Sequence, residues 1–442
     1  MLKPLFISTE EGLSRLKAVK NRNFDISSYE KQVREILNQV IEKGDQAIVE
    51  YTNRFDSPKI KLENILVSDE EIDQAYQKVS KEFIKSLKKS IEHVKDFHKK
   101  QLPNSWMITR EDGSILGQLV RTVDAAGLYV PGGKGGSTPL CSSVVMNAVP
   151  AVIAGVKRII MATPPNKDGE ISPYLIVAAK EVGIHKIYKM GSAWAIFAMA
   201  YGTESIEKVD VIVGPGNIFV TIAKKMVSGR VGIDMIAGPS EILIIADKYA
   251  NPCYIAADLL SQAEHDTMAT AILLTESEDL ANEVSKELSK QIEKLDRCEI
   301  AQKSLETNSA LLIVEDIEQA VDIANQIAPE HLELMVKDPW QLIGKIKHAG
   351  AIFLGEYTPE PIGDYIAGAN HVLPTMGTAK FSSALGVETF IKRSSIISYS
   401  KEAFFNDAED VIRLANVEGL GAHANSISVR LEKKSKLIHK GV

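Results

Sequence analysis

The sequence predicts an α/β protein with two doubly wound sheets and small helical segments at its two ends. Two observations support this fold class. With 442 residues the chain is long enough for two or three structural units. Short apolar runs typical of strands alternate with helical stretches, and each run is separated from the next by enough residues for the crossover helix that parallel strands require. The alternation is interrupted around "AGPSE" and then resumes, so we expect two sheets.

The N-terminal region, residues 28–100, is rich in charge and has a helical period. The stretch "YEKQVREILNQVIEKG" ends at Gly44, and "DEEIDQAYQKVSKEFIKSLKKSIEHVKDFHKK" begins with an acidic first turn. We expect surface helices here.

From about Trp106 the pattern changes to extended runs, "GQLVRTV" and "AGLYV", which stop at "PGGKGGSTP" near an expected domain boundary. The first alternation contains "RIIMATPP", "HKIYKMG" and "VDVIVGPGN". The second contains "ILIIAD", "ATAILLTES", "SALLIVED" and "AGAIFLGEY". The final stretch, from about Leu385, is polar, helical and too short for a large core of its own, so we expect it to dock elsewhere.

Two similar turns, "IVGPGN" and "IAGPSE", each place a helix-capping residue, Asn217 or Ser240, where an open α/β sheet binds ligands. A purely structural turn explains them equally well. The "PGGKGG" loop lacks the spacing of a dinucleotide or phosphate motif, so we interpret it as a flexible turn.

Composition excludes several classes of protein. The formal net charge is −7 and no basic cluster is interleaved with aromatic residues, which argues against nucleic acid as a partner. No long apolar run or signal-like start is present, so we expect a cytoplasmic protein that does not bind membranes. Cys141, Cys253 and Cys298 form neither a disulfide framework nor a CxxC site, so a metal would be held by nitrogen and oxygen atoms.

Such donors occur in three segments. In "LLSQAEHDTMA", Gln262 and His265 stand one helical turn apart, so their side chains can converge on one point. A solvated face or a histidine bonded within the core is the alternative. Asp364 and His371 lie in a Gly- and Pro-rich loop, and Glu418 and His423 lie in the C-terminal stretch "NVEGLGAHANSISVRL". The donors of Gln262, His265, Asp364 and His423 together suit zinc.

A second candidate pair, Glu330 and His331, follows Pro329, which ends the preceding helix. Adjacent glutamate and histidine can act as general bases, although such pairs also lie on surfaces.

Eight strings in one order resemble the histidinol dehydrogenase family: "GLYVPGG", "VGPGN", "GPSEILIIAD", "DLLSQAEHD", "APEHLEL", "GDYIAGANHVLPT", "KRSSIISYS" and "EGLGAHANSISVRL". The resemblance implies oxidation of L-histidinol to L-histidine, in two hydride transfers to NAD through histidinal. It also implies zinc, a homodimer and incomplete Rossmann-like sheets.

Carried over by residue, the resemblance assigns zinc to Gln262, His265, Asp364 and His423, and the bases to Glu330 and His331. His331 would take the alcohol proton, and Glu330 would activate water for attack on the aldehyde. The implied substrate contacts are Ser240, Gln262, His265, His331, Asp364, His371, Glu418 and His423, and the implied cofactor contacts are Tyr129, Trp194 and Asn217.

One departure from the family lies on the cofactor side. Where the family reads Gly-Gly-Ala-Gln, this chain reads Gly191, Ser192, Ala193 and Trp194. An indole lacks the paired donor and acceptor of an amide, though it can stack on a flat ring. Trp194 therefore either faces the cofactor or is an ordinary core aromatic.

With the sequence pattern, the resemblance suggests five segments. They are an N-terminal tail (1–24), a first α/β domain made of two separate stretches (25–128 and 238–385), a second, cofactor-side α/β domain (129–237) and a C-terminal helical segment (386–442) that docks on the partner subunit.

Two other functions remain open. One is a related zinc-dependent NAD dehydrogenase for another small amino- or hydroxy-alcohol, and the other is a zinc hydrolase that uses no nicotinamide. For a dehydrogenase, attack on the aldehyde by Cys141 or Cys253 is a rival to activated water.

Overall fold

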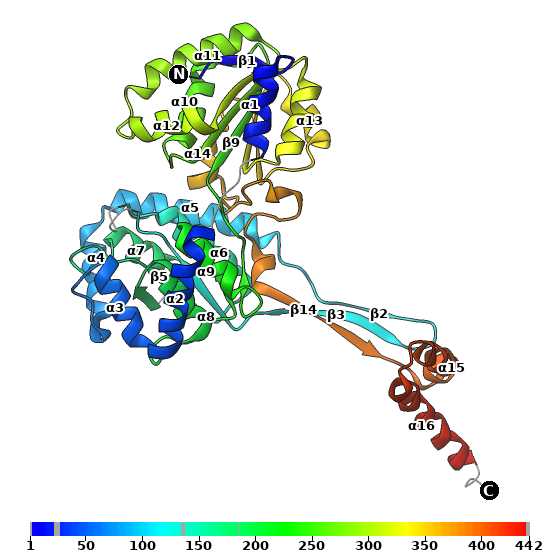
Figure 1. Cartoon of the computed structure of the whole chain (residues 1–442). Helices are drawn as coiled ribbons and strands as arrows, with labels where there is room; N and C mark the ends of the chain where they lie inside the picture. Colours follow the sequence, from blue (N-terminus) through cyan, green and yellow to red (C-terminus); the bar gives the residue numbers. More distant parts are fainter. Residues whose placement is uncertain (1, 22–26, 134–137, 185, 439–442) are drawn as a thin grey trace. The chain divides into compact units, whose positions relative to one another are not determined.

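The computed structural model describes residues 2–21, 27–133, 138–184 and 186–438, which form two compact units. The first unit comprises Met1–Leu102 and Val123–Phe390, and the second comprises Pro103–Thr122 and Ile391–Val442. The predicted α/β class with two parallel sheets is confirmed in the first unit (Figure 1).

The first sheet has six parallel strands in the order β1-β11-β10-β9-β12-β13. Central strands are continuous apolar runs because both faces are covered. Ile242 and Ile244 of β9 pack with α10, α11 and α12, whereas Leu243 and Ile245 pack with α1 and α13. The bounds are β1 Pro4–Phe6, β9 Glu241–Ala246, β10 Thr270–Thr275, β11 Ala310–Ile313, β12 His331–Met335, β13 Ala351–Leu354, α1 Glu10–Lys20, α10 Pro252–Ala263, α11 Glu278–Ile292, α12 Cys298–Asn308, α13 Ile317–Ile327 and the short α14 Glu360–Ile362.

The second sheet has five parallel strands in the order β6-β5-β4-β7-β8. Ala126 and Leu128 of β4 pack with α4, α5, α6 and α7, and Ala125 and Tyr129 pack with α2, α3, α8 and α9. The bounds are β4 Ala125–Tyr129, β5 Arg158–Thr163, β6 Lys186–Lys189, β7 Val211–Val213, β8 Gly232–Ile233, α2 Ser27–Lys43, α3 Asp45–Phe55, α4 Asp69–Lys78, α5 Lys81–Lys99, α6 Cys141–Ala154, α7 Pro173–Glu181, α8 Ser192–Tyr201 and α9 Ile218–Val227.

The sheets divide the chain differently from the expected segments. Within the expected tail, the described residues 2–21 are not separate, because β1 joins the first sheet and α1 packs against it. The helices expected in residues 25–128 of the first domain instead cover the second sheet, where Val33, Ile36 and Val40 of α2 share a core with α8 and α9. An amphipathic helix carries an apolar face but no local sign of which sheet that face will cover.

The second unit contains an antiparallel sheet in the order β14-β3-β2 and the helices α15 and α16. Its strand β14 corrects the expectation that residues 386–442 are wholly helical. The partner of β14 is β3, which lies far earlier in the chain, so the pairing leaves no local signal. The bounds are β2 Trp106–Thr109, β3 Ile115–Thr122, β14 Ile391–Ser398, α15 Lys401–Val417 and α16 Gly421–Ile438. Among the described helices, none is long and apolar enough to cross a membrane.

Candidate active site and metal centre

A cavity of about 910 Å³ in the first unit is lined by residues of the loops and helices that adjoin both parallel sheets, and by His331 of β12. It lies at the amino ends of β9 and β12 and at the carboxyl ends of β4 and β7. Asn217 caps α9 as predicted, because its side-chain oxygen accepts hydrogen bonds from two backbone N–H groups of the first turn, at 3.0 and 3.2 Å. The expectation that Ser240 caps a helix is wrong, because Ser240 leads directly into β9. Both residues line the cavity.

The two predicted bases lie side by side where β12 begins. The preceding helix ends at Ala328, in a left-handed conformation (φ +54°), and Pro329 prevents its continuation. The Glu330 carboxylate accepts a hydrogen bond from the Glu241 N–H (2.8 Å), and Nδ1–H of His331 donates to the Glu241 carbonyl (2.8 Å). Because Nδ1 carries the proton, Nε2 of His331 is a free acceptor, and it is buried without a partner among the described residues.

Burial moves the pKa values of these neighbours in opposite directions. It raises the pKa of Glu330 well above its ordinary value and lowers that of His331 to about 4, because a buried site disfavours the charged form of each group. His331 is therefore held neutral and able to accept a proton, and an ionised Glu330 is a stronger base than an exposed glutamate.

Two of the predicted zinc ligands come from the end of α10. Gln262 is fully buried, and neither atom of its side-chain amide has a hydrogen-bond partner among the described residues. Leaving a buried amide unsatisfied costs free energy, so Gln262 fits a ligand that binds a group from outside the chain. His265 follows in a turn beyond the helix, and its backbone N–H donates to the Gln262 carbonyl (3.2 Å), which keeps the two residues close.

Asp364 lies in a single turn of π-helix, Gly363–Ala367, a form that often occurs at functional sites. Its Oδ2 is 3.5 Å from Nδ1 of His371. Burial acts to raise the pKa of Asp364, but His371 and His331 together hold it below its ordinary value. Together, Gln262, His265 and Asp364 present the nitrogen and oxygen donors that zinc binds.

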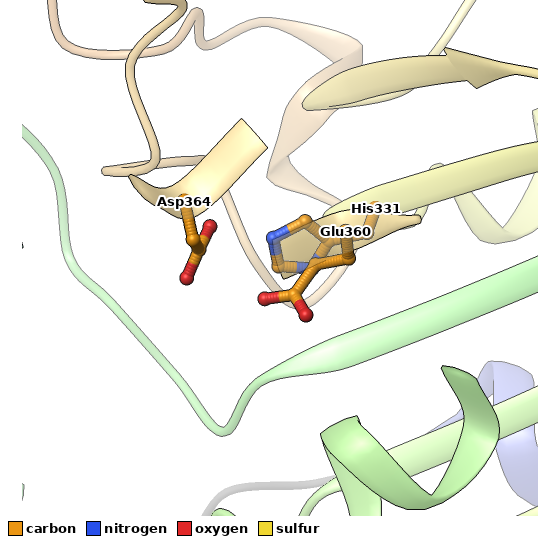
Figure 2. Close-up of side chains that lie close together, drawn as sticks. All are labelled: His331, Glu360 and Asp364. Atoms are coloured by element: carbon orange, nitrogen blue, oxygen red, sulfur yellow. The ribbon is translucent and has the colours of Figure 1, made fainter. Parts of the chain in front are cut away.

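Glu360 was not predicted from the sequence. One nitrogen or oxygen atom from each of His331, Glu360 and Asp364 lies within 4.8 Å of the other two, and Figure 2 shows the three side chains converging. Burial and the neighbouring Asp364 raise the pKa of Glu360 to about 8. Its spacing of four residues from Asp364, about one helical turn, is the signal that could have revealed it.

The loop after β7 is fixed from within the protein. The carboxylate of Asp234 accepts the Gly214 N–H (2.8 Å), Lys224 donates to the Gly214 carbonyl (2.9 Å), and the two side chains form an ion pair. Both are almost completely buried. This arrangement holds the strand-to-helix turn that leads to Asn217.

A sequence profile of histidinol dehydrogenase matches residues 19–431. The chain belongs to the histidinol dehydrogenase family. It is 57% identical to histidinol dehydrogenase of Desulfotalea psychrophila over 98% of this chain and 100% of that protein. The corresponding enzyme of Carboxydothermus hydrogenoformans is 52% identical, over 97% of this chain and 100% of that protein.

The crystal structure of histidinol dehydrogenase from Elizabethkingia anophelis has a similar fold, with a TM-score of 0.92 at 36% identity. The match covers 98% of this chain and 99% of that one. Of the positions that the histidinol dehydrogenase resemblance assigned, Ser240, Gln262, His265, Glu330, His331, Asp364, His371 and Asn217 line the cavity.

The cofactor positions suggested by histidinol dehydrogenase do not all line this cavity. Tyr129 is buried, and its hydroxyl accepts a hydrogen bond from the Ser192 N–H (3.0 Å). Trp194 is 3% exposed, donates its indole N–H to Thr52 (3.0 Å) and stacks on Tyr51 with ring centroids 5.7 Å apart. Trp194 is thus buried and packed within the core. Contact of either residue with a cofactor stays a prediction, and residues 134–137 of the "PGGKGG" region lie outside the described residues.

Two further histidinol dehydrogenase positions lie in the second unit. Glu418 is the C-cap residue directly after α15, His423 lies in α16, and both are exposed within that unit. Attack on the aldehyde by a cysteine thiol, the rival to activated water, finds no support here, since neither Cys141 nor Cys253 is among the residues lining the cavity. Burial also raises the pKa of Cys141 to about 11, which disfavours the reactive thiolate.

Proposed function

We propose that this protein oxidises L-histidinol to L-histidine through histidinal, in the last steps of histidine biosynthesis, as a zinc- and NAD-dependent homodimer. The observation that carries the proposal is the cavity itself. It contains the unsatisfied amide of Gln262, the acceptor nitrogen of His331 and the buried carboxylate of Glu330.

In this proposal the residues of the chain have separate roles. His331 Nε2 accepts the proton of the substrate hydroxyl, and its Nδ1–H bond to the Glu241 carbonyl keeps the imidazole in the required tautomer. Glu330 takes a proton from the water that attacks the aldehyde, the oxygen source for the carboxylic acid. Gln262, His265, Asp364 and His423 would hold zinc. When bound, zinc acts as a Lewis acid that orients the substrate, and NAD accepts the hydride.

The cofactor proposal has support from the second sheet. The turn after β7 and the first residues of α9 line the cavity. Asn217 already accepts hydrogen bonds from two first-turn N–H groups of α9, so it is the partial positive charge of the helix start that suits the pyrophosphate of a dinucleotide.

We further propose that each site is shared, with Glu418 and His423 supplied by the partner subunit. Apolar side chains exposed in the second unit support this proposal, since apolar surface of this kind commonly marks an interface. They include Met107, Ile108, Ile397, Leu414 and Val417, of which Val417 is 83% exposed.

Formation of NADH with histidinol tests the proposed reaction. We expect two NADH per histidinol consumed and histidine as product. Turnover only of other amino- or hydroxy-alcohols would instead indicate a related dehydrogenase. Hydrolysis without NAD would indicate a zinc hydrolase.

The metal is tested by His265→Asn. We expect this variant to lose most bound zinc and activity while keeping its far-UV circular dichroism, because the apolar cores do not depend on one ligand. Zinc content at the wild-type level would remove His265 from the ligand set.

A further inference from the structure

The π-helical turn that carries Asp364 is hydrogen-bonded to helix α5. The last carbonyl groups of a helical turn have no partner within the turn, so they need a donor from elsewhere. The Ser90 hydroxyl of α5 donates to the Tyr365 carbonyl (2.6 Å). Further along the same helix, Nδ1–H of His93 donates to the Ile366 carbonyl (2.7 Å). These carbonyl groups belong to the two residues directly after Asp364.

The main chain of the loop lies directly against α5. Gly368 has a left-handed backbone (φ +106°), and a Cβ there would lie only 2.6 Å from the His93 carbonyl oxygen. Only glycine therefore allows this close approach. Ser90 is buried and His93 is half-buried, so water competes little for their hydrogen bonds to the turn.

The far end of the loop is hydrogen-bonded to the same group of helices. The side-chain amide of Asn370 donates to the Met146 carbonyl of α6 (2.8 Å) and lies 3.4 Å from Nε2 of His98 in α5. Asn370 precedes His371, whose Nδ1 is 3.5 Å from the Asp364 carboxylate. Since α5 and α6 cover the second sheet, helices of the predicted cofactor half support a loop that carries a predicted zinc ligand.

The position of Asp364 matters for metal binding. A ligand must be held within about 0.5 Å of its productive position, and hydrogen bonds behind the ligand provide this precision. Residues that orient a metal ligand therefore affect metal affinity without touching the metal. The turn at Gly363–Ala367 is short, and a π-helical turn is a rare form, so its geometry depends on the groups that bind its carbonyls.

Building on the proposed zinc site, we propose that Ser90 and His93 are positioning residues for the metal centre. By donating to the carbonyl groups of Tyr365 and Ile366, they hold the π-helical turn in the form that presents Asp364 to the cavity. Neither Ser90 nor His93 is among the described residues lining the cavity or among the predicted ligands. Their effect on zinc is therefore transmitted through the loop.

The test compares variants that remove or keep a donor. Ser90→Ala and His93→Leu each remove one. His93→Asn keeps it, because the amide N–H of asparagine stands where Nδ1–H of histidine stood. Ser86→Ala is the matched control, since it makes the same substitution at an exposed serine four positions earlier on α5.

Zinc affinity of each full-length protein is measured by competition with a chromophoric chelator. We expect Ser90→Ala and His93→Leu to weaken zinc binding roughly 10- to 100-fold, the usual cost of losing a group that orients a metal ligand. His93→Asn and Ser86→Ala should keep close to the wild-type affinity. Visible absorption of the cobalt-substituted enzymes, which reports the geometry of the ligands, should change only in the first two variants.

Urea denaturation separates positioning from a general loss of stability. Lower stability of Ser90→Ala and His93→Leu, with wild-type zinc affinity and an unchanged cobalt spectrum, would overturn the inference. Equal loss of zinc from His93→Asn and His93→Leu would also overturn it for His93. If His93→Leu does not fold, the comparison of Ser90→Ala with Ser86→Ala decides the question.

Oxidation of histidinol by the wild type is a separate measurement. Its absence would overturn the proposed reaction, while the zinc affinities would still decide the role of Ser90 and His93. A wild type that binds no zinc would overturn both the metal site and this inference. Wild-type affinity in both donor-removing variants, with histidinol still oxidised, would overturn the inference alone.

Discussion

At the scale of single residues, substitutions of the adjacent bases Glu330 and His331 should affect the oxidation rates of histidinol and histidinal differently. Asparagine at 331 can still donate to the Glu241 carbonyl but cannot take a proton, so His331→Asn should slow oxidation of both histidinol and histidinal by roughly 10²- to 10⁴-fold. Glu330→Gln should chiefly slow oxidation of histidinal, since only that step needs activated water. Steady-state rates with each substrate give the comparison. Equal losses on both substrates in Glu330→Gln would contradict the division of roles.

Asp56 gives a prediction about stability and pH. Its Oδ2 is buried without a partner among the described residues, and burial raises its pKa from 3.8 to about 7. Between pH 3.8 and about 7 the Asp56 carboxyl is ionised in the unfolded chain and protonated in the folded chain. The free energy of unfolding of the wild type therefore falls as pH rises through this window. Asparagine at 56 carries no charge, so Asp56→Asn avoids the cost of burying an ionised carboxylate. Its melting temperature should exceed that of wild type above about pH 7, and the difference should vanish below about pH 4.

Asp168→Asn is the control for this effect. Asp168 is exposed, and its ion pair with Lys59 lowers the pKa of its carboxyl, so the sign is opposite. This variant should gain nothing at high pH. A similar gain in both variants would refute the assignment of the effect to the burial of Asp56.

At the scale of elements, the turn between β7 and α9 depends on a buried ion pair. Lys224→Met leaves Asp234 charged, buried and without its partner, so we expect a loss of about 3–5 kcal/mol in the free energy of unfolding. The neighbouring Lys225→Met removes an exposed pair with Glu30, for which about 0–1 kcal/mol is expected. Urea denaturation measures both variants. Equal losses would show that the buried position of Lys224 has no special importance.

At the scale of the whole molecule, sharing of sites between subunits can be tested with mixed dimers. His265→Ala and His423→Ala should each be inactive as homodimers. When the two are unfolded and refolded together, one site of each mixed dimer collects both defects and the other collects none. Random pairing under two-fold symmetry should then restore roughly a quarter of the wild-type sites. If the mixture remains inactive while wild type refolds, the ligands come from a single chain.

Much of the candidate site could be predicted from local patterns. Gln262 and His265 stand at helical spacing, and Pro329 marks the turn that presents Glu330 and His331. Glu360 was missed because its importance depends on nearness to His331, a residue on another element. The environment of Trp194 was equally undecided, since its hydrogen bond to Thr52 joins segments far apart in the chain.

Hydrophobic period and turn residues are local properties, so the α/β class, the two parallel sheets and the assignment of most segments to helix or strand could be predicted from the sequence. Three features became known only from the three-dimensional packing: which helices cover which sheet, that β14 is a strand, and that Glu360 lies close to Asp364 and His331. These features depend on contacts between residues distant in the chain, and burial at those contacts is also what shifts the pKa values of Glu330 and His331.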